Sequence, residues 1–230
     1  MRWPLTILLA VCGGFAGAAA WDFSGLGASA TREYLLAHPE VLPEAMDRLQ
    51  LQQRQARIEP VRDQLEQPFP GAVLGNPNGS VTLVEFSDYA CGYCRQSVAD
   101  VKQLVAANPD LRVVVREFPI LRPESADAAR MGFAAAQQGK FAAYHDAMYD
   151  LGPPTAETIE QAARQAGLDI AAARRAIASG AFEPFLQANM ELANHIGISG
   201  TPGWVVGDQI IDGAVGRTVL GDAIEEARQS

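Results

Sequence analysis

The spacing of hydrophobic residues changes several times along the chain, and each spacing predicts a different element. Between Thr31 and Gln67 the spacing is helical, with apolar residues at Leu35, Leu36, Val41, Leu42, Met46, Leu49, Ile58, Val61 and Leu65. Pro39, Pro43 and Pro60 interrupt this pattern. We therefore expect a short helix, a break near Pro39 to Pro43, and a longer helix that bends or stops near Pro60. The polar stretch 50–57 is typical of an exposed or partner-packed helical arm.

The next segments alternate between strand and helix patterns. Val81–Phe86 is almost continuously apolar, which predicts a strand buried on both faces. A helical pattern follows Cys91 and stops at Asn108-Pro109, and the Val-rich segment Leu111–Phe118 predicts a second strand. This order is a βαβ unit, so the two strands should be parallel. Residues 68–80 hold three prolines and three glycines and are interpreted as a linker or loop.

The C-terminal half begins with helices alone. Residues 123–195 show helical patterns broken at Gly139, Gly152-Pro153-Pro154, Gly167 and Gly180. A β-hairpin is then predicted from Gly203–Val206, a Gly-Asp turn and Gln209–Ile211, followed by a last helix over about 217–228. The pattern predicts an α/β domain made of a βαβ half and a ββα half, with a block of helices inserted between them.

Composition and charge narrow the class of protein. The 230 residues are 48% hydrophobic, which excludes a largely disordered chain. A net charge of −9 argues against nucleic acid as a partner, because phosphate binding needs clustered cations.

The N-terminus has the pattern of a secretory signal peptide. Met1–Ala20 carries one cation, Arg2, then a short apolar run, and ends in small residues. We expect cleavage after Ala20; a membrane anchor and a lipoprotein acylated at Cys12 are the alternatives. Cleavage would leave Cys91 and Cys94 as the only cysteines, in a compartment where disulfides persist.

Those two cysteines form the motif Cys91-Gly92-Tyr93-Cys94, which follows the predicted buried strand and opens the next helix. Free N–H groups and the helix dipole at that position stabilise a thiolate at Cys91 and make it nucleophilic. Cys94 lies nearly one turn further on the same face. It can close a disulfide with Cys91 and can resolve a mixed disulfide formed by Cys91.

Two non-catalytic interpretations of the motif are weaker. A static disulfide over so short a loop removes little chain entropy. A zinc site needs four ligands, and the other candidates are scattered along the chain: His38, His145 and His195. Redox chemistry is therefore favoured, and we expect neither a metal nor an organic cofactor.

A second motif, Ser199–Gly203, lies directly before the predicted hairpin. With the Cys-x-x-Cys motif and the inserted helices, its Thr201-Pro202 pair resembles the DsbA-like branch of the thioredoxin superfamily, over about residues 81–229. The resemblance implies a thioredoxin fold with an inserted helical domain. It also implies that Pro202 is cis and lies beside the cysteines, and that Thr201, Pro202, Gly92 and Tyr93 contact an extended substrate.

Glu85 lies on the predicted buried strand, six residues before Cys91. A buried carboxylate needs a partner or a function. The resemblance implies an acid that moves the proton to or from Cys94; the alternative is a side chain facing a loop and solvent. Structural roles are expected for a further set of conspicuous residues: a loop or cap for Asp88, packing for Tyr144, His145 and Tyr149, and core support of the site for Trp204.

The segment Tyr34–Leu42 is similar to the N-terminal part of suppressor-of-copper-sensitivity C proteins and related Com1-type proteins. This resemblance implies an arm that makes a homo-oligomer, although the arm could instead fold back on its own domain. The predicted organisation is a signal peptide (1–20), the arm (21–67), the thioredoxin fold (68–122 and 196–230) and the inserted helical domain (123–195).

The direction of the chemistry depends on Gly92-Tyr93. A histidine there would stabilise the reduced form and raise the oxidising power, and this chain has none. Gly-Tyr is also the dipeptide of the periplasmic isomerase DsbC, and an isomerase benefits from several sites in one assembly. We favour a periplasmic disulfide isomerase or reductase that acts on reduced or misoxidised exported proteins and receives electrons from a membrane redox partner. The alternatives are a DsbA-type dithiol oxidase, a Cu(I)-binding copper-protective carrier and an interaction scaffold.

Overall fold

A computed structural model describes Trp3 and residues 26–229. The predicted signal peptide, apart from Trp3, and Cys12 lie outside the described residues. The chain divides into two compact units, Met1–Gln52 and Gln53–Ser230. In the described part of the chain, no helix combines the length and the apolar character needed to cross a membrane.

The described part of the first unit is helical. Helix α2 covers Leu26–Ala37, and α3 covers Val41–Ile58, so the boundary between the units falls within α3. The predicted break between the two helices is confirmed, and Pro43 is accommodated in the first turn of α3, where its missing N–H costs little. Large apolar side chains of this unit are exposed: Tyr34, Leu36, Leu42, Met46, Leu49 and Leu51.

The second unit is built on a five-stranded sheet with the order β1-β3-β2-β4-β5. The predicted βαβ unit is confirmed, since β2 (Val81–Ser87) and β3 (Leu111–Glu117) are parallel and α5 (Gly92–Ala107) connects them. The predicted hairpin is also present, as β4 (Gly203–Val206) and β5 (Gln209–Asp212).

The interpretation of residues 68–80 as a linker is wrong in one respect. Strand β1 (Val73–Gly75) lies in this segment and pairs antiparallel with the outer edge of β3. Three residues are too few to show a periodic pattern, and the prolines and glycines around them are typical of a loop.

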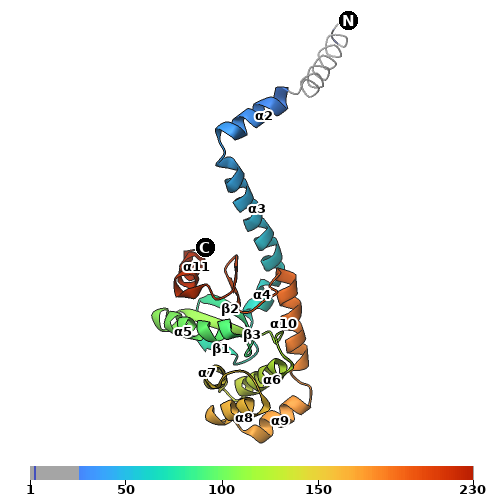
Figure 1. Cartoon of the computed structure of the whole chain (residues 1–230), viewed down its shortest axis with the longest axis vertical. Helices are drawn as coiled ribbons and strands as arrows, with labels where there is room; N and C mark the ends of the chain where they lie inside the picture. The colour runs from blue at the N-terminus through green and yellow to red at the C-terminus, as the bar shows by residue number, and fades with distance from the viewer. Residues whose placement is uncertain (1–2, 4–25, 230) are drawn as a thin grey trace. The chain divides into compact units, whose positions relative to one another are not determined.

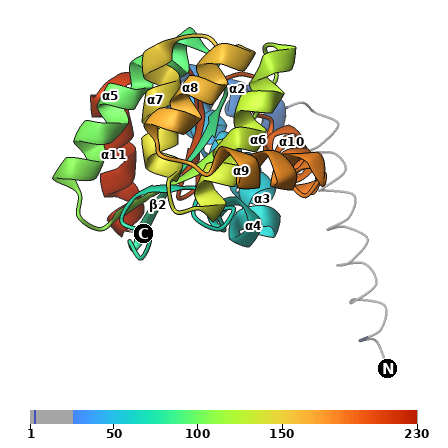
Figure 2. The ribbon, with the colours of Figure 1, turned by 90° about the horizontal axis from the view of Figure 1, so that it is seen from below.

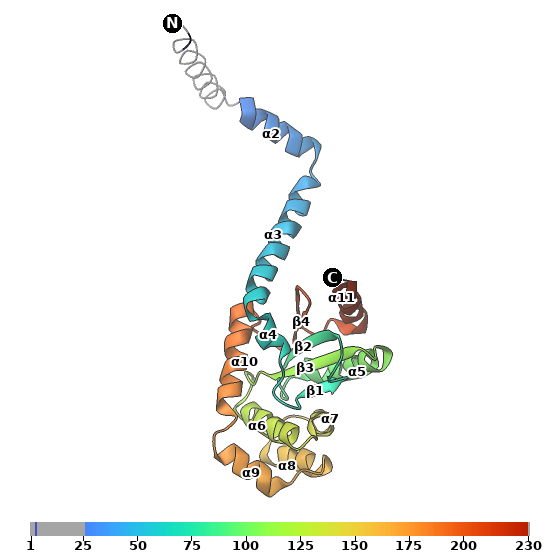
Figure 3. The same cartoon turned by 180° about the vertical axis from the view of Figure 1, so that it is seen from behind.

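Helices cover both faces of the sheet, as Figures 1 and 3 show. Leu83 of β2 belongs to a buried cluster with α5 and α11 (Gly216–Gln229). Val84 and Phe86 point to the opposite face and pack with α10 (Glu183–Ile196). Strand β2 is therefore buried on both faces, as its sequence predicts.

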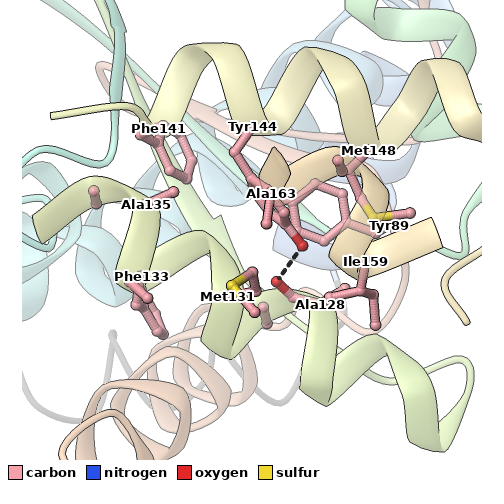
Figure 4. Close-up of a cluster of buried hydrophobic side chains, with 14 of the residues drawn as sticks. Tyr89, Ala128, Met131, Phe133, Ala135, Phe141, Tyr144, Met148, Ile159 and Ala163 are labelled. Atoms are coloured by element: carbon pink, nitrogen blue, oxygen red, sulfur yellow. Dashed lines mark hydrogen bonds between the residues drawn. The ribbon is translucent and has the colours of Figure 1, made fainter. Parts of the chain in front are cut away.

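The inserted helices form a third core, which lies below the sheet in Figures 1 and 3 and in front of it in the view from below in Figure 2. They are α6 (Pro123–Gln137), α7 (Phe141–Leu151), α8 (Ala156–Gln165) and α9 (Ile170–Ala178). The predicted breaks at Gly139, Gly152, Gly167 and Gly180 are confirmed, and each of these glycines has a positive φ. Figure 4 shows how side chains of α6 and α7 interlock in this core.

The end of the predicted arm differs from the expectation. Ile58, at the end of α3, and Leu65, on α4 (Arg62–Glu66), are fully buried in the core of the second unit. The short helix η1 (Glu59–Val61) connects them through Pro60. Residues 58–67, the last ten of the range 21–67, thus help to cover one face of the sheet. The apolar spacing resumes there, after the polar stretch 50–57 ends.

Candidate active site

Cys91 is the N-cap residue of α5, with an extended backbone that leaves its side chain at the mouth of the helix. The backbone N–H of Cys94 donates to Cys91 Sγ at 3.3 Å. Cys91 Sγ in turn donates to the carbonyl oxygen of Thr201 at 3.2 Å. Thr201–Pro202 is a cis peptide bond, as the resemblance implied. The structure therefore brings the two sequence motifs, 110 residues apart, into direct contact.

The two cysteines differ in their surroundings, although both are free thiols in this structure. Cys91 retains 5% of its surface and Cys94 retains none. Burial, followed by the negative charge of Glu85, raises the pKa of Cys94. Cys94 therefore needs a proton acceptor before it can act as a nucleophile.

The rim of the site is partly apolar. Tyr93, the second residue of α5, is 64% exposed, and Gly92 is exposed beside it. Ile120 and Leu121 are also exposed, and their N–H groups both donate to Asp88 Oδ2 at 2.9 Å. Asp88 is thus a loop residue that ties the segment after β3 to the active-site loop, as expected.

Glu85 lies beneath the cysteines and is 2% exposed, which excludes the alternative of a side chain facing solvent. It is paired across β2 and β4 with Trp204, which is fully buried in the adjoining core. Burial raises the pKa of Glu85, opposed by the charge of His145 and by a hydrogen bond from Ser87. The carboxyl group can therefore hold a proton at a higher pH than an exposed glutamate.

Two hydroxyl groups extend the site away from Glu85. Ser87 Oγ lies 3.0 Å from Glu85 Oε1, and the hydroxyl of Tyr149 lies 2.7 Å from Ser87 Oγ. Tyr149 OH also lies 3.2 Å from the carbonyl oxygen of Asp88. The sequence predicted only packing for Tyr149, and Ser87 was not singled out. The available signal for Ser87 was its spacing of two residues from Glu85, which puts both on one face of the strand.

A second buried acid was missed entirely. Glu117, the last residue of β3, is 1% exposed and accepts a hydrogen bond from Tyr89 OH at 2.9 Å. Burial raises the pKa of Glu117 well above its ordinary value of 4.5. It lies against Gly132 of α6, where an added Cβ would stand 2.7 Å from Glu117 Oε1. A charged pair, Arg116-Glu117, at the end of a Val-rich strand was the signal in the sequence.

Aromatic rings pack around the buried polar side chains beneath the cysteines. Tyr89 packs against Tyr144 and Tyr149, with ring centroids 5.7 and 5.1 Å away, and the ring of His145 lies 4.9 Å from that of Tyr149. Packing is thus confirmed for Tyr144, His145 and Tyr149 of α7. Among the described residues, no cluster of three or more His, Cys, Asp or Glu side chains could hold a metal ion.

Comparison with known proteins identifies the family. A family model described as thioredoxin matches residues 69–226, and a model described as the copper resistance protein ScsC N-terminal domain matches residues 30–56. The chain belongs to the thioredoxin family of thiol-disulfide oxidoreductases, in its DsbA-like, ScsC-type branch.

Solved structures agree with this assignment. A thioredoxin-like oxidoreductase from Silicibacter pomeroyi DSS-3 is 42% identical, with a TM-score of 0.69 over 74% of this chain and 98% of that one. BcfH from Salmonella enterica Typhimurium is 30% identical, with a TM-score of 0.67 over 93% and 99%. Proteus mirabilis ScsC in a transitional conformation is 26% identical, with a TM-score of 0.65 over 86% and 92%.

The curated relatives that match part of this chain are Na(+)/H(+) antiporters. The Na(+)/H(+) antiporter NhaA 1 of Mycobacterium sp. (strain KMS) is 36% identical over 87 residues, and NhaA 3 of Salinispora tropica is 29% identical over 161 residues. The match spans 13% and 24% of the length of these two antiporters. The likeness covers a minor part of each antiporter.

Proposed function

We propose that this protein catalyses thiol-disulfide exchange on exported proteins in the periplasm, as a disulfide isomerase or reductase. The observation that carries the proposal is the position of Cys91 Sγ, which is capped by the Cys94 N–H and lies 3.2 Å from the Thr201 carbonyl beside a cis proline. A sulfur at a helix N-terminus is stabilised as a thiolate, which is the attacking form in disulfide exchange.

In the first step, the Cys91 thiolate attacks a disulfide of the substrate. A bond forms between Cys91 Sγ and one substrate sulfur, and the disulfide bond breaks so that the other substrate sulfur leaves as a thiolate. In isomerisation, that thiolate attacks a different disulfide, and a substrate thiolate finally displaces Cys91. In reduction, Cys94 attacks Cys91 Sγ, the substrate leaves reduced, and a membrane electron donor reduces the resulting Cys91–Cys94 disulfide.

The residues around the sulfur atoms have distinct parts in this scheme. Glu85 accepts the proton of Cys94 as Cys94 attacks, because it is buried next to that thiol. The backbone at Thr201 and Pro202 aligns an extended substrate segment, and Gly92 and Tyr93 flank it.

The isomerase or reductase direction rests on the dipeptide between the cysteines and on the arm. Gly92-Tyr93 offers no cation to stabilise the thiolate further, which favours a less oxidising pair. The N-terminal unit exposes apolar side chains, including Leu42 and Leu49, that suit contact with other copies of the chain. A homo-oligomer would hold several Cys91 sites in one particle.

The test compares the wild-type protein with Cys91→Ser and Cys94→Ser. We expect the wild type to restore activity to scrambled ribonuclease, Cys91→Ser to lose this activity completely, and Cys94→Ser to accumulate mixed disulfides with its substrates. The wild type should be found mostly as the dithiol in cells. Rapid oxidation of reduced peptides without rescue of scrambled ribonuclease would instead identify a dithiol oxidase.

The role of the arm has a separate test. Light scattering of the mature wild-type chain should give the mass of an oligomer, and Leu42→Ser with Leu49→Ser should lower that mass to one chain. These substitutions leave the buried residues of the second unit unchanged. A monomeric wild type would remove the oligomer from the proposal.

Copper protection is a second candidate, favoured by the match of residues 30–56 to the ScsC N-terminal model and by the two adjacent free thiols. Two thiolates are suitable ligands for Cu(I). Titration of the reduced wild type with Cu(I), compared with Cys91→Ser, measures whether the pair binds the ion. Equal binding by both proteins would contradict this candidate.

A further inference from the structure

The buried hydroxyl groups beneath the active site form one continuous chain of contacts. It runs from Glu85 Oε1 to Ser87 Oγ (3.0 Å), from there to Tyr149 OH (2.7 Å), and on to the carbonyl oxygen of Asp88 (3.2 Å). All the groups are at least 97% buried, so each needs a hydrogen-bond partner, and the Asp88 carbonyl has a second partner in the backbone N–H of Cys91 at 2.9 Å.

The number of hydrogens depends on the protonation of Glu85. Ser87 and Tyr149 each carry one hydroxyl hydrogen, and a carboxylate carries none. With Glu85 ionised, two hydrogens serve three contacts, and the Tyr149–Asp88 contact is left without one when both hydroxyls point toward the carboxylate. With Glu85 protonated, its hydrogen points to Ser87, that of Ser87 to Tyr149, and that of Tyr149 to the Asp88 carbonyl. The hydroxyls can therefore serve both forms of Glu85, because the Asp88 carbonyl keeps the Cys91 N–H as its partner when Tyr149 points toward Ser87.

Two groups of this chain also bond to the reacting cysteines. A hydrogen bond from the Ser87 side chain lowers the pKa of Cys94, and the same hydroxyl lies 3.0 Å from Glu85 Oε1. The Asp88 carbonyl at the far end also accepts the backbone N–H of Cys91 at 2.9 Å.

Tyr149 is also fixed relative to the active-site helix. Arg95, the residue after Cys94, donates from Nε to the backbone carbonyl of Tyr149 at 2.9 Å. This bond joins α5 to α7, so the inserted helical domain holds the Tyr149 hydroxyl at a constant distance from the cysteines.

We propose that Ser87 and Tyr149 are positioning residues for proton transfer from Cys94, because their hydroxyls point toward Glu85 while it is ionised and able to accept that proton, and reverse direction once it has accepted it. The proposal rests on the proposed function. In the step itself, the S–H bond of Cys94 breaks and its proton bonds to Glu85. The sulfur then displaces the substrate from Cys91, and the substrate leaves as a thiolate. No other reactant is needed.

Other charged groups also face Glu85 and influence its titration. They come from each neighbouring element: Cys94 on α5, His145 on α7 and Glu117 on β3, whereas β4 contributes the neutral Trp204. The variants used below leave all of these groups in place.

The test is Tyr149→Phe with Tyr144→Phe as the matched control. Tyr144 lies on the same helix, is equally buried, and donates its hydroxyl to the carbonyl of Ala128 at 3.0 Å (Figure 4), so it is not part of the chain that begins at Glu85. Two properties are measured against pH: the rate at which Cys94 resolves a mixed disulfide on Cys91, and the infrared carboxylic-acid band of Glu85, assigned with Glu85→Gln.

We expect Tyr149→Phe to slow resolution about fivefold, the equivalent of one hydrogen bond. It should also move the loss of the Glu85 acid band to higher pH, because donation toward the ionised carboxylate is weakened, whereas Tyr144→Phe should change neither property. Ser87→Ala should act in the same direction as Tyr149→Phe, and Ser87→Thr, which keeps a hydroxyl, should restore the wild-type profile.

Identical behaviour of Tyr149→Phe and Tyr144→Phe in both measurements would overturn the proposal. If Tyr149→Phe does not fold, the Ser87→Ala and Ser87→Thr pair decides, and equal profiles for these two would also overturn it. A wild type that cannot exchange thiols would contradict the proposed function instead, while the infrared titration would still report on the hydroxyl chain.

Discussion

Arg116 and Glu117 are neighbours on β3 and point to opposite faces of the sheet, so they allow a direct comparison of two buried ionisable side chains. Among the described residues, neither has an oppositely charged side chain within ion-pair distance. Arg116 donates to the carbonyl oxygens of Gln64, Leu65 and Gln67 at the end of α4 and to Asn189 Oδ1. Glu117, like Glu85, is bonded by a hydroxyl group.

The hydrogen-bond partners of Arg116 make its site structural, whereas those of Glu117 and Glu85 allow a change of protonation. Carbonyl oxygens only accept hydrogen bonds, so the Arg116 arrangement has one state. Burial lowers the pKa of Arg116 to about 10, which still leaves it charged at neutral pH. Hydroxyl groups both donate and accept, so the acids on the other face can gain or lose a proton without moving any heavy atom.

The largest effect is expected on stability, when the hydrogen bonds of Arg116 are removed. Arg116→Met should lower the free energy of unfolding by about 4 kcal/mol, because several buried carbonyl oxygens lose their donor. Urea unfolding measures this, with Arg164→Met, an exposed residue of α8, as the control that should leave the midpoint unchanged. The folded variant should keep the wild-type pH profile of thiol exchange. A changed profile would contradict the separation of the two sites.

The next effect concerns the acid beside Cys94. Glu85→Gln should slow the resolution of mixed disulfides about a hundredfold near neutral pH, because no internal group accepts the Cys94 proton. The remaining rate should rise in proportion to hydroxide concentration. Stopped-flow measurement of the Cys91 mixed disulfide follows this step, and an unchanged rate would remove Glu85 from the mechanism.

The smallest effect is a pH dependence of stability. The folded pKa of Glu117 is raised, so between its ordinary value and the folded value the native state binds more protons than the unfolded state. The stabilisation is therefore complete at pH values below about 4.5 and is lost as the pH rises through the folded pKa. Glu117→Gln should remove a decline of about 1.4 kcal/mol per pH unit within that window. Urea unfolding at pH 5, 6, 7 and 8 measures the decline, and equal slopes for both proteins would contradict a buried neutral Glu117.

The sequence predicted the elements that are determined by residues close together in the chain. The Val-rich strands, the glycines that end the inserted helices, and the Cys-x-x-Cys motif at a helix start all leave a pattern within a few residues. Strand β1 did not, since it is three residues long and exists only because β3 offers an edge.

Part of the site could not be predicted for a related reason. Ser87 and Tyr149 are 62 residues apart, and their contact depends on how α7 docks on the sheet. The sequence could show that Glu85 lies on a buried strand. It could not show which hydroxyls surround that carboxyl group, because they come from an element whose position is decided by tertiary packing.

Gly132 of α6 shows how closely the inserted helical domain packs against the sheet. Alanine in the middle of α6 would favour the helix by about 1 kcal/mol. Its methyl group would, however, collide with the carboxyl oxygen of Glu117. The inserted helices are therefore not an interchangeable module: they and the strands beneath them are matched to each other by the absence of a single methyl group.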